Sequence, residues 1–292
     1  MSTAANKPAV VVGIDGSETA LGAAQWAAEF AARHALALTL LHVIPRWEWH
    51  FVTGAPPAEF DQGAAGDRAL AAAQAAVHSA HPDLDVRTAA VRGAVTTALA
   101  EASQSARLLV VGTGAADHRV LGGHAVTVAH RAHCPVVVWR PPVAERAGKP
   151  LPVVVGIDES DGSTRSLAEA FDIARALRAP LTVVHMWEIG AAVGMGDLGG
   201  QGNMDWPLLE LLQSQQRRRM DELVEPFSKY PNSHVTKVFQ DVSPAKGLAE
   251  LSREARLVVV GSHGRGRLAG ALLGSVSQTL IHHAECPVLI VR

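Results

Sequence analysis

Cysteine, aromatic residues and charge are all scarce in this chain. Only two of the 292 residues are cysteine, which excludes a disulfide-stapled scaffold and suits a reducing compartment. Charged residues make up 18% and the formal net charge is −2, so a broad basic surface for nucleic acid is not expected. An apolar fraction of 48% excludes disorder over most of the chain, and with 4% aromatic residues the core must be aliphatic.

Long hydrophobic runs are missing as well. Residues 1–8 are short and mixed, unlike the basic start, apolar stretch and small-residue cleavage site of a secretory signal. No apolar run approaches the roughly 18–20 residues that a membrane helix needs. These absences predict a cytoplasmic protein that binds neither a membrane nor nucleic acid.

The most informative feature that is present is an internal duplication. The run Val-Val-Gly-Ile-Asp at 11–15 returns at 154–158, and the runs at 41–43, 106–112 and 133–138 return in the same order at 184–186, 255–261 and 285–290. Solenoid repeats are only about 20–50 residues long, so this pattern indicates two copies of one domain. We expect domains at 1–140 and 151–292, joined by a proline-flanked linker at 141–150.

Apolar runs alternate with helical patterns in each copy. In the second copy we expect strands at 153–157, 181–186, 234–240, 257–261 and 287–292, and helices at 163–177, 207–227, 244–255 and 275–283. Strands that are apolar throughout are typical of a parallel sheet covered on both faces. Right-handed crossovers then give an α/β, doubly wound fold with five strands in each domain. Ligands of such sheets bind beyond the carboxyl ends of the strands.

A glycine-rich loop follows the fourth expected strand of the second copy. It reads Gly261-x-x-Gly264, nine further residues, and then Gly274-Ser275 at the start of a helix. The first amides of a helix have no partner within it and, together with the helix dipole, favour an anion such as phosphate. The loop is neither a Walker loop nor the Gly-x-Gly-x-x-Gly dinucleotide fingerprint. The loop therefore predicts a phosphate-binding site that differs from both of these motifs.

The repeated blocks and the spacing Gly-x2-Gly-x9-Gly-Ser resemble the universal stress protein family in its tandem-domain form. The resemblance covers nearly the whole chain and implies Rossmann-like, five-stranded sheets that bind ATP, together with a regulatory role in a stress response. It implies phosphate contacts from Gly261, Gly264, Gly274, Ser275 and Val276. It further implies ribose and adenine contacts near Asp158, with Gly156, Ile157, Met186 and Val260 around the base.

The first copy departs from the family pattern. Gly-Thr-Gly replaces Gly-x-x-Gly at 112–114, and nine residues rather than twelve precede the second glycine pair. Gly123 has no hydroxyl where the family has Ser or Thr. Two interpretations stay open, a pseudo-site kept for domain pairing and a site for adenosine or a diphosphate. The residues of the second interpretation are Asp15, Val43, Gly112 and Gly122.

Three functions are compatible with these residues. The first is a regulatory ATP-binding protein, with or without Mg²⁺, that acts on a protein partner whose identity the sequence does not reveal. The second is a nucleotide-free scaffold for dimerisation or interaction. The third is a slow ATP hydrolase, although the sequence shows no convincing base to activate water. The apolar edges of the fifth strands, at 136–139 and 288–291, predict pairing either within a pseudo-twofold monomer or across a homodimer.

Overall fold

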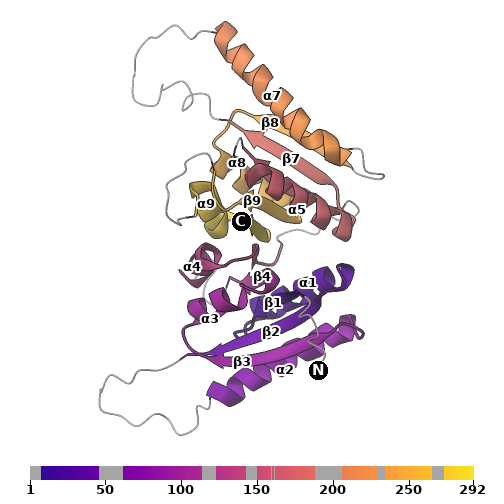
Figure 1. The fold of residues 1–292 in the computed structure, drawn as a ribbon, viewed down its shortest axis with the longest axis vertical. Helices are drawn as coiled ribbons and strands as arrows, with labels where there is room; N and C mark the ends of the chain where they lie inside the picture. The colour runs from indigo at the N-terminus through magenta and orange to yellow at the C-terminus, as the bar shows by residue number, and fades with distance from the viewer. Residues whose placement is uncertain are drawn as a thin grey trace, which may run out of the picture.

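The described part of the chain forms one continuous ten-stranded sheet. The computed structural model describes residues 8–45, 62–113, 123–142, 150–158, 160, 162–187, 206–228, 234–264 and 273–292. The strand order is β3-β2-β1-β4-β5-β10-β9-β6-β7-β8 (Figure 1). Neighbouring strands within each half are parallel, and the two halves share one order of strands. The predicted tandem, doubly wound α/β fold is thereby confirmed.

The strands have the following bounds. The first half contains β1 (Ala9–Gly13), β2 (Ala37–Ile44), β3 (Val86–Arg92), β4 (Ala106–Gly112) and β5 (Val136–Trp139). The second half contains β6 (Val153–Ile157), β7 (Leu181–Met186), β8 (Val235–Gln240), β9 (Leu257–Gly261) and β10 (Val288–Val291). The expected strands at 153–157, 181–186 and 257–261 agree with these bounds, and the other two begin one residue later than expected.

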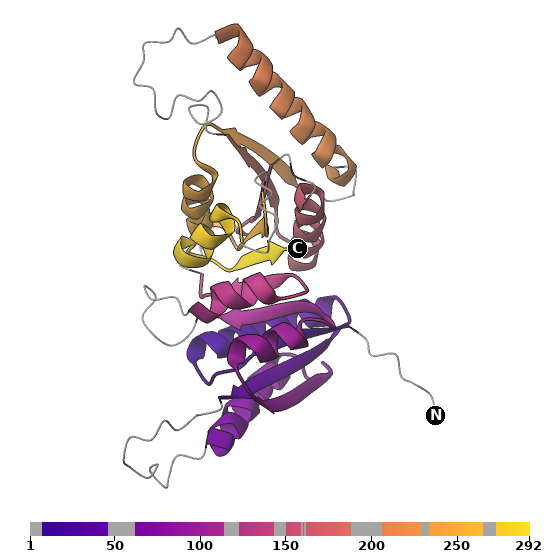
Figure 2. The same cartoon turned by 60° about the vertical axis from the view of Figure 1, so that its left-hand side comes forward.

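Helices cover both faces of the sheet. One face carries α1 (Glu18–Arg33), α2 (Gln62–Ala80), α5 (Gly162–Leu177) and α7 (Trp206–Ser228). The opposite face carries α3 (Val95–Ala102), α4 (Gly123–Arg131), α8 (Pro244–Leu251) and α9 (Ser275–His283). Figure 2 shows the two layers from the side, with the halves stacked along the sheet.

The two cores explain why the strands are apolar throughout. Successive side chains of a strand point to opposite faces. Val10 and Val12 therefore pack into the core beneath α1 and α2, whereas Val11 packs into the core beneath α3 and α4. All three are at most 6% exposed, so neither face of this strand tolerates a polar residue.

One expected helix is shorter than its sequence pattern. The pattern at 244–255 predicts a continuous helix, but α8 ends at Leu251 and a 3₁₀ turn spans Ser252–Glu254. The hydroxyl of Ser252 donates to Ala249 O (2.6 Å) and accepts the Glu285 amide (2.8 Å). A contact with a residue far along the chain thus ends the helix, and sequence periodicity carries no sign of it.

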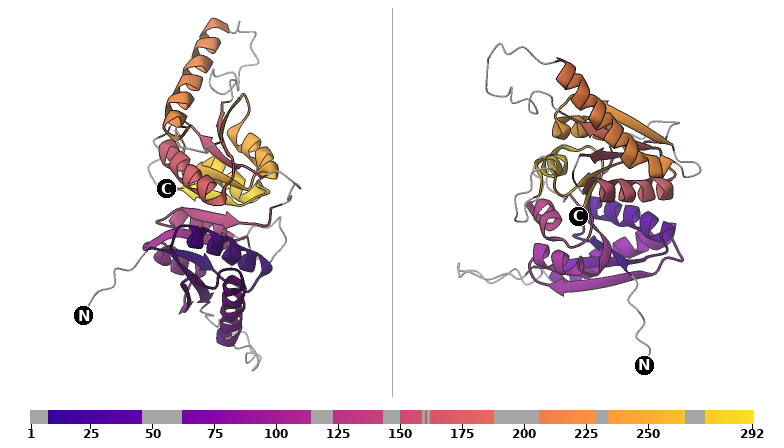
Figure 3. Two further views of the ribbon diagram at one scale, coloured as in Figure 1. Left: turned by 90° about the vertical axis from the view of Figure 1, so that its right-hand side faces the viewer. Right: turned by 45° about the horizontal axis from the view of Figure 1, so that its top comes forward.

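The two halves meet at their fifth strands. Val136, Val137 and Val138 of β5 pair with β10 in antiparallel register, so the predicted pairing of the two edges occurs within one chain. Arg140 follows β5 and donates to the carbonyl oxygens of Ile281 and Ala284, at the end of α9. Arg292 follows β10 and donates to the carbonyl oxygens of Ala129 and His130, at the end of α4. Each half therefore caps the last helix of the other with an arginine, in a pseudo-twofold arrangement with the C-terminus at the junction (Figure 3).

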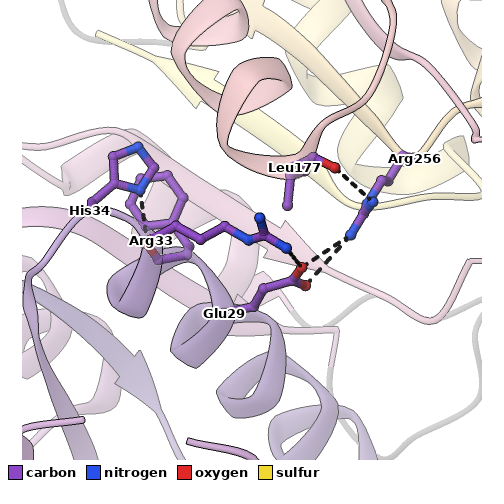
Figure 4. A network of polar contacts seen from close by, with 6 residues as sticks. Glu29, Arg33, His34, Leu177 and Arg256 are labelled. Atoms are coloured by element: carbon purple, nitrogen blue, oxygen red, sulfur yellow. Dashed lines mark hydrogen bonds and ion pairs between the residues drawn. The ribbon is translucent and has the colours of Figure 1, made fainter. Parts of the chain in front are cut away.

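Polar contacts between α1 and the second half reinforce this junction. His34 Nε2 lies 2.9 Å from Asp172 Oδ2 on α5. Glu29 lies 2.9 Å from Arg33 on its own helix and 3.4 Å from Arg256, which also donates to Leu177 O (Figure 4). These groups are partly exposed, so each pair contributes little on its own, about 0–1 kcal/mol.

Candidate functional site

A cavity of about 310 Å³ lies beyond the carboxyl ends of β6, β7 and β9. The starts of α5, α8 and α9 border it, and sheets of this kind place their ligands beyond the carboxyl ends of their strands. All ten second-domain residues to which the resemblance assigns contacts line this one cavity: Gly156, Ile157, Asp158, Met186, Val260, Gly261, Gly264, Gly274, Ser275 and Val276. Residues that are up to 120 positions apart in the sequence are thus brought together by the crossover connections.

Asp158 is held in a fixed orientation just after β6. Its Oδ1 accepts the amide of Ser160 (2.9 Å) and the hydroxyl of Ser163 (2.9 Å), and Ser163 Oγ accepts the Asp158 amide (2.8 Å). Its Oδ2 faces the glycine loop, since a Cβ added at Gly264 would lie 2.9 Å from it. Gly264 is therefore required by a close approach of backbone to carboxylate. One carboxylate oxygen is engaged, and the other points across the cavity.

The start of α9 forms the opposite wall. Gly274 occupies the N-cap position, and glycine has no side chain with which to cap the first amides of the helix. Gly274 N donates to Ser262 O (2.8 Å), and the Ser277 hydroxyl donates to Gly261 O (2.7 Å), so the loop is tied to the helix on both sides. The first amides of a helix lack a partner within it, and at this end they face a cavity. The arrangement suits a bound anion.

The remaining wall is apolar. Val184, Met186, Leu248, Val260 and Val276 line it together. Close packing positions these side chains: a Cβ on Gly156 would lie 2.7 Å from Leu248, and a Cβ on Gly247 would lie 2.5 Å from the sulfur of Met186. An apolar wall beside a carboxylate and an anion-binding helix end suits a ligand that is partly aromatic and partly anionic.

Comparison with known proteins decides the family. The sequence pattern of the universal stress protein family matches residues 8–140 and again residues 151–292. The chain belongs to the universal stress protein family. It holds two copies of the family's domain in tandem.

The relatives of this tandem universal stress protein match its whole length. A universal stress protein of Mycobacterium tuberculosis is 33% identical over 307 residues, which cover 100% of this chain and 99% of the relative. A second one from the same organism is 34% identical over 312 residues, with the same coverage. The crystal structure of a universal stress protein from Archaeoglobus fulgidus has a TM-score of 0.70 at 17% identity, covers 97% of this chain and 96% of its own, and supports the fold.

Sequence reasoning missed several residues that line the cavity. They are Ser160, Ser163, Ser166, Val184, Pro244, Leu248 and Ser277, and the loop residue His263 lines the cavity too. Of these, Ser163, Ser166 and Ser277 are buried serines on the helices. Alignment of the two domains on their repeated blocks places Ala20, Ala23 and Ala125 at their positions. The second domain thus has serine where the first has alanine. This difference was the signal in the sequence for these three residues, because a buried helix position needs no hydroxyl for packing.

The first domain of this universal stress protein is arranged differently at the matching positions. Asp15 is exposed, and its Oδ1 accepts the amide (2.9 Å) and hydroxyl (2.6 Å) of Ser17. Val43 is buried. Gly112 lies under the start of α1, where an added Cβ would be 3.1 Å from the backbone of Thr19. Gly122 lies outside the described residues.

The described residues were also compared with the requirements of a metal site and of a membrane-spanning helix. Among the described residues, no group of three or more His, Cys, Asp or Glu side chains is placed to hold a metal ion. None of the helices described by the structure combines the length and the hydrophobicity needed to cross a bilayer.

Proposed function

We propose that this universal stress protein binds ATP in the cavity of its second domain. The observation that supports this most strongly is the convergence of three surfaces on one cavity of about 310 Å³: an uncapped helix start, an oriented carboxylate and an apolar wall. The phosphates then lie against Gly261, Gly264, Gly274, Ser275 and Val276. The ribose lies beside Asp158, and the adenine lies against Met186 and Val260, near the backbone of Gly156 and Ile157.

Mg²⁺ is proposed to enter with the triphosphate rather than to occupy a site of its own. Mg²⁺ is usually held by one or two carboxylates together with substrate phosphates and water. The Oδ2 of Asp158 is such a carboxylate oxygen, and it faces the glycine loop. The metal would neutralise phosphate charge beside that carboxylate.

The proposed role of the nucleotide is regulatory. Phosphate at the start of α9 stabilises the same helix whose other end is capped by Arg140 of the first domain. Occupancy of the cavity thereby strengthens the junction between the domains and changes the surface offered to a regulatory protein partner. Membership of the universal stress protein family supports a role in a stress response.

Native mass spectrometry of the freshly purified full chain, followed by calorimetric titration with ATP, tests this proposal. We expect one ATP per chain. Asp158→Asn keeps the turn to Ser160 but removes the charge, so ATP should bind about tenfold more weakly, which corresponds to about 1.4 kcal/mol. Asp15→Asn is the matched control in the first domain and should leave the affinity unchanged.

Each other outcome has a defined meaning. A chain that binds no nucleotide at millimolar ATP is a scaffold, and the proposal is then wrong. Two nucleotides per chain, with both variants weakened, would show that the first domain binds as well.

A further inference from the structure

Ser166 carries a buried hydroxyl that the rest of the described structure leaves without a partner. Its side chain lies on α5 at 0% exposure, and its Oγ has no hydrogen bond to any described residue. Every other buried serine of the described residues has a hydrogen-bond partner for its hydroxyl: Ser103, Ser163, Ser252, Ser262 and Ser277. Ser166 is therefore an exception that packing alone does not explain.

Neither the helix nor the core requires this hydroxyl. A serine on a helix can donate to a carbonyl one turn earlier. Ser103 and Ser252, which directly follow α3 and α8, make such bonds to Ala100 O and Ala249 O. Ser166 makes no such bond. The matching residue of the first domain is Ala23, which is also fully buried, so a methyl group satisfies the packing there. An unpartnered buried hydroxyl lowers the free energy of unfolding. Only the second domain carries a hydroxyl at this position.

The position of Ser166 identifies what its partner would be. Ser166 lines the cavity between α5 and the end of β9, and its Oγ lies 3.5 Å from the place where a Cβ on Gly261 would be. Gly261 begins the glycine loop, and its carbonyl is already occupied by Ser277. Ser166 therefore reaches the side of the cavity assigned to phosphate. A hydroxyl can donate to a phosphate oxygen, and such charge-assisted bonds are stronger than neutral ones.

We propose that Ser166 donates a hydrogen bond to a phosphate oxygen of the nucleotide and is a specificity-determining residue for phosphorylated ligands. This inference rests on the proposed binding of ATP in the second domain. The hydroxyl is costly in the empty chain and is satisfied in the complex. The first domain, with Ala23, lacks this contact.

The test compares the full chain with its Ser166→Ala variant in two measurements. Calorimetric titration with adenosine, AMP, ADP and ATP should show about tenfold weaker ATP binding in the variant and unchanged adenosine binding, because adenosine has no phosphate. The melting temperature of the nucleotide-free variant should be equal to or higher than that of the wild-type chain. A packing role would lower the melting temperature, so the two measurements separate the explanations.

Two control variants complete the design. Ser252→Ala removes a buried serine of the second domain that has partners away from the cavity, so it should lower the melting temperature and leave ATP affinity unchanged. Ala23→Ser introduces the hydroxyl in the first domain and should not change ATP affinity at the second.

Three outcomes overturn the inference while ATP binding itself stands. They are an unchanged ATP affinity in Ser166→Ala, an equal loss for adenosine and ATP, and a lower melting temperature of the nucleotide-free variant. A wild-type chain that binds none of the four ligands overturns the proposed function and this inference together.

Discussion

The two domains keep the same sheet but line its ligand-binding edge with different chemistry. Where the second domain places Ser163, Ser166, Ser275 and Ser277, the first places Ala20, Ala23, Gly123 and Ala125. The three alanines are at most 5% exposed. Duplication thus preserved the positions that build the core and exchanged hydroxyls for methyl groups or hydrogen at the edge. Packing in the core constrains the volume of a side chain, whereas a bound ligand constrains its polarity. Side-chain polarity at this edge could therefore change between the domains while side-chain volume in the core was kept.

A second contrast lies on the α2 and α7 face. His42 and His185 occupy matching positions, and the Nδ1 atoms of both contact a main-chain carbonyl, of Ile14 (2.7 Å) and Ile157 (3.1 Å) respectively. In the first domain α2 packs directly on the ring, because a Cβ at Gly66 would lie 2.4 Å from it. In the second domain the ring lines a cavity of about 380 Å³ beneath α7. On this face α2 covers the histidine ring in the first domain, whereas the matching ring borders a cavity in the second.

Both domains place an arginine at the matching point of the junction, and removing these arginines gives the largest expected effect. Arg140→Met should lower the free energy of unfolding by about 3 kcal/mol, because the variant leaves carbonyl groups at the end of α9 without a charged donor. Arg292→Met should cost about 2 kcal/mol, because this side chain is less buried. Urea denaturation of both variants measures the two values. Equal or negligible losses would contradict the unequal burial of the two caps.

The next largest expected effect comes from a side chain that blocks the proposed ATP cavity of the second domain. Gly264→Val would drive a side chain into Asp158 Oδ2, so ATP affinity should fall about 30-fold, or about 2 kcal/mol. Gly162→Ala is the control, since its added Cβ would make only ordinary contacts, with Ser160 Oγ at 3.5 Å and His263 O at 4.0 Å. Fluorescence titration with a labelled ATP analogue compares them. Similar affinities for the two variants would remove Gly264 from the proposed site.

At neutral pH the smallest expected effect concerns the two cysteines, which precede β5 and β10. Burial raises the pKa of Cys134 to about 11 and that of Cys286 to about 12. Each thiol should therefore resist a thiol reagent at pH 8, with Cys286 the slower of the two. Because both folded pKa values lie above the unfolded value of 9.0, stability should be fully present below pH 9 and fall as pH rises toward 11–12. Denaturation midpoints from pH 8 to 11 measure this, and a midpoint that rises with pH would contradict it.

Sequence patterns located the strands that bound the cavity but missed the contacts that complete it. The apolar run at 257–261 is β9, because a strand covered on both faces admits only apolar residues. The run at 244–255 was predicted as one helix and is not, because Ser252 contacts Glu285, 33 residues away. The arginine caps could not be predicted either, since the partners of Arg140 lie 141 and 144 residues along the chain.

Periodicity and internal repetition were enough to establish two tandem α/β domains and a glycine loop at the end of a strand, because these features depend on neighbours along the chain. Only the folded chain brought Asp158 opposite Gly264 and placed Ser166 against Gly261, since crossover connections join segments about 100 residues apart. The pairing of β5 with β10 is likewise a tertiary outcome. Both edges are apolar, and only their geometry shows that they meet within one chain and not between two copies.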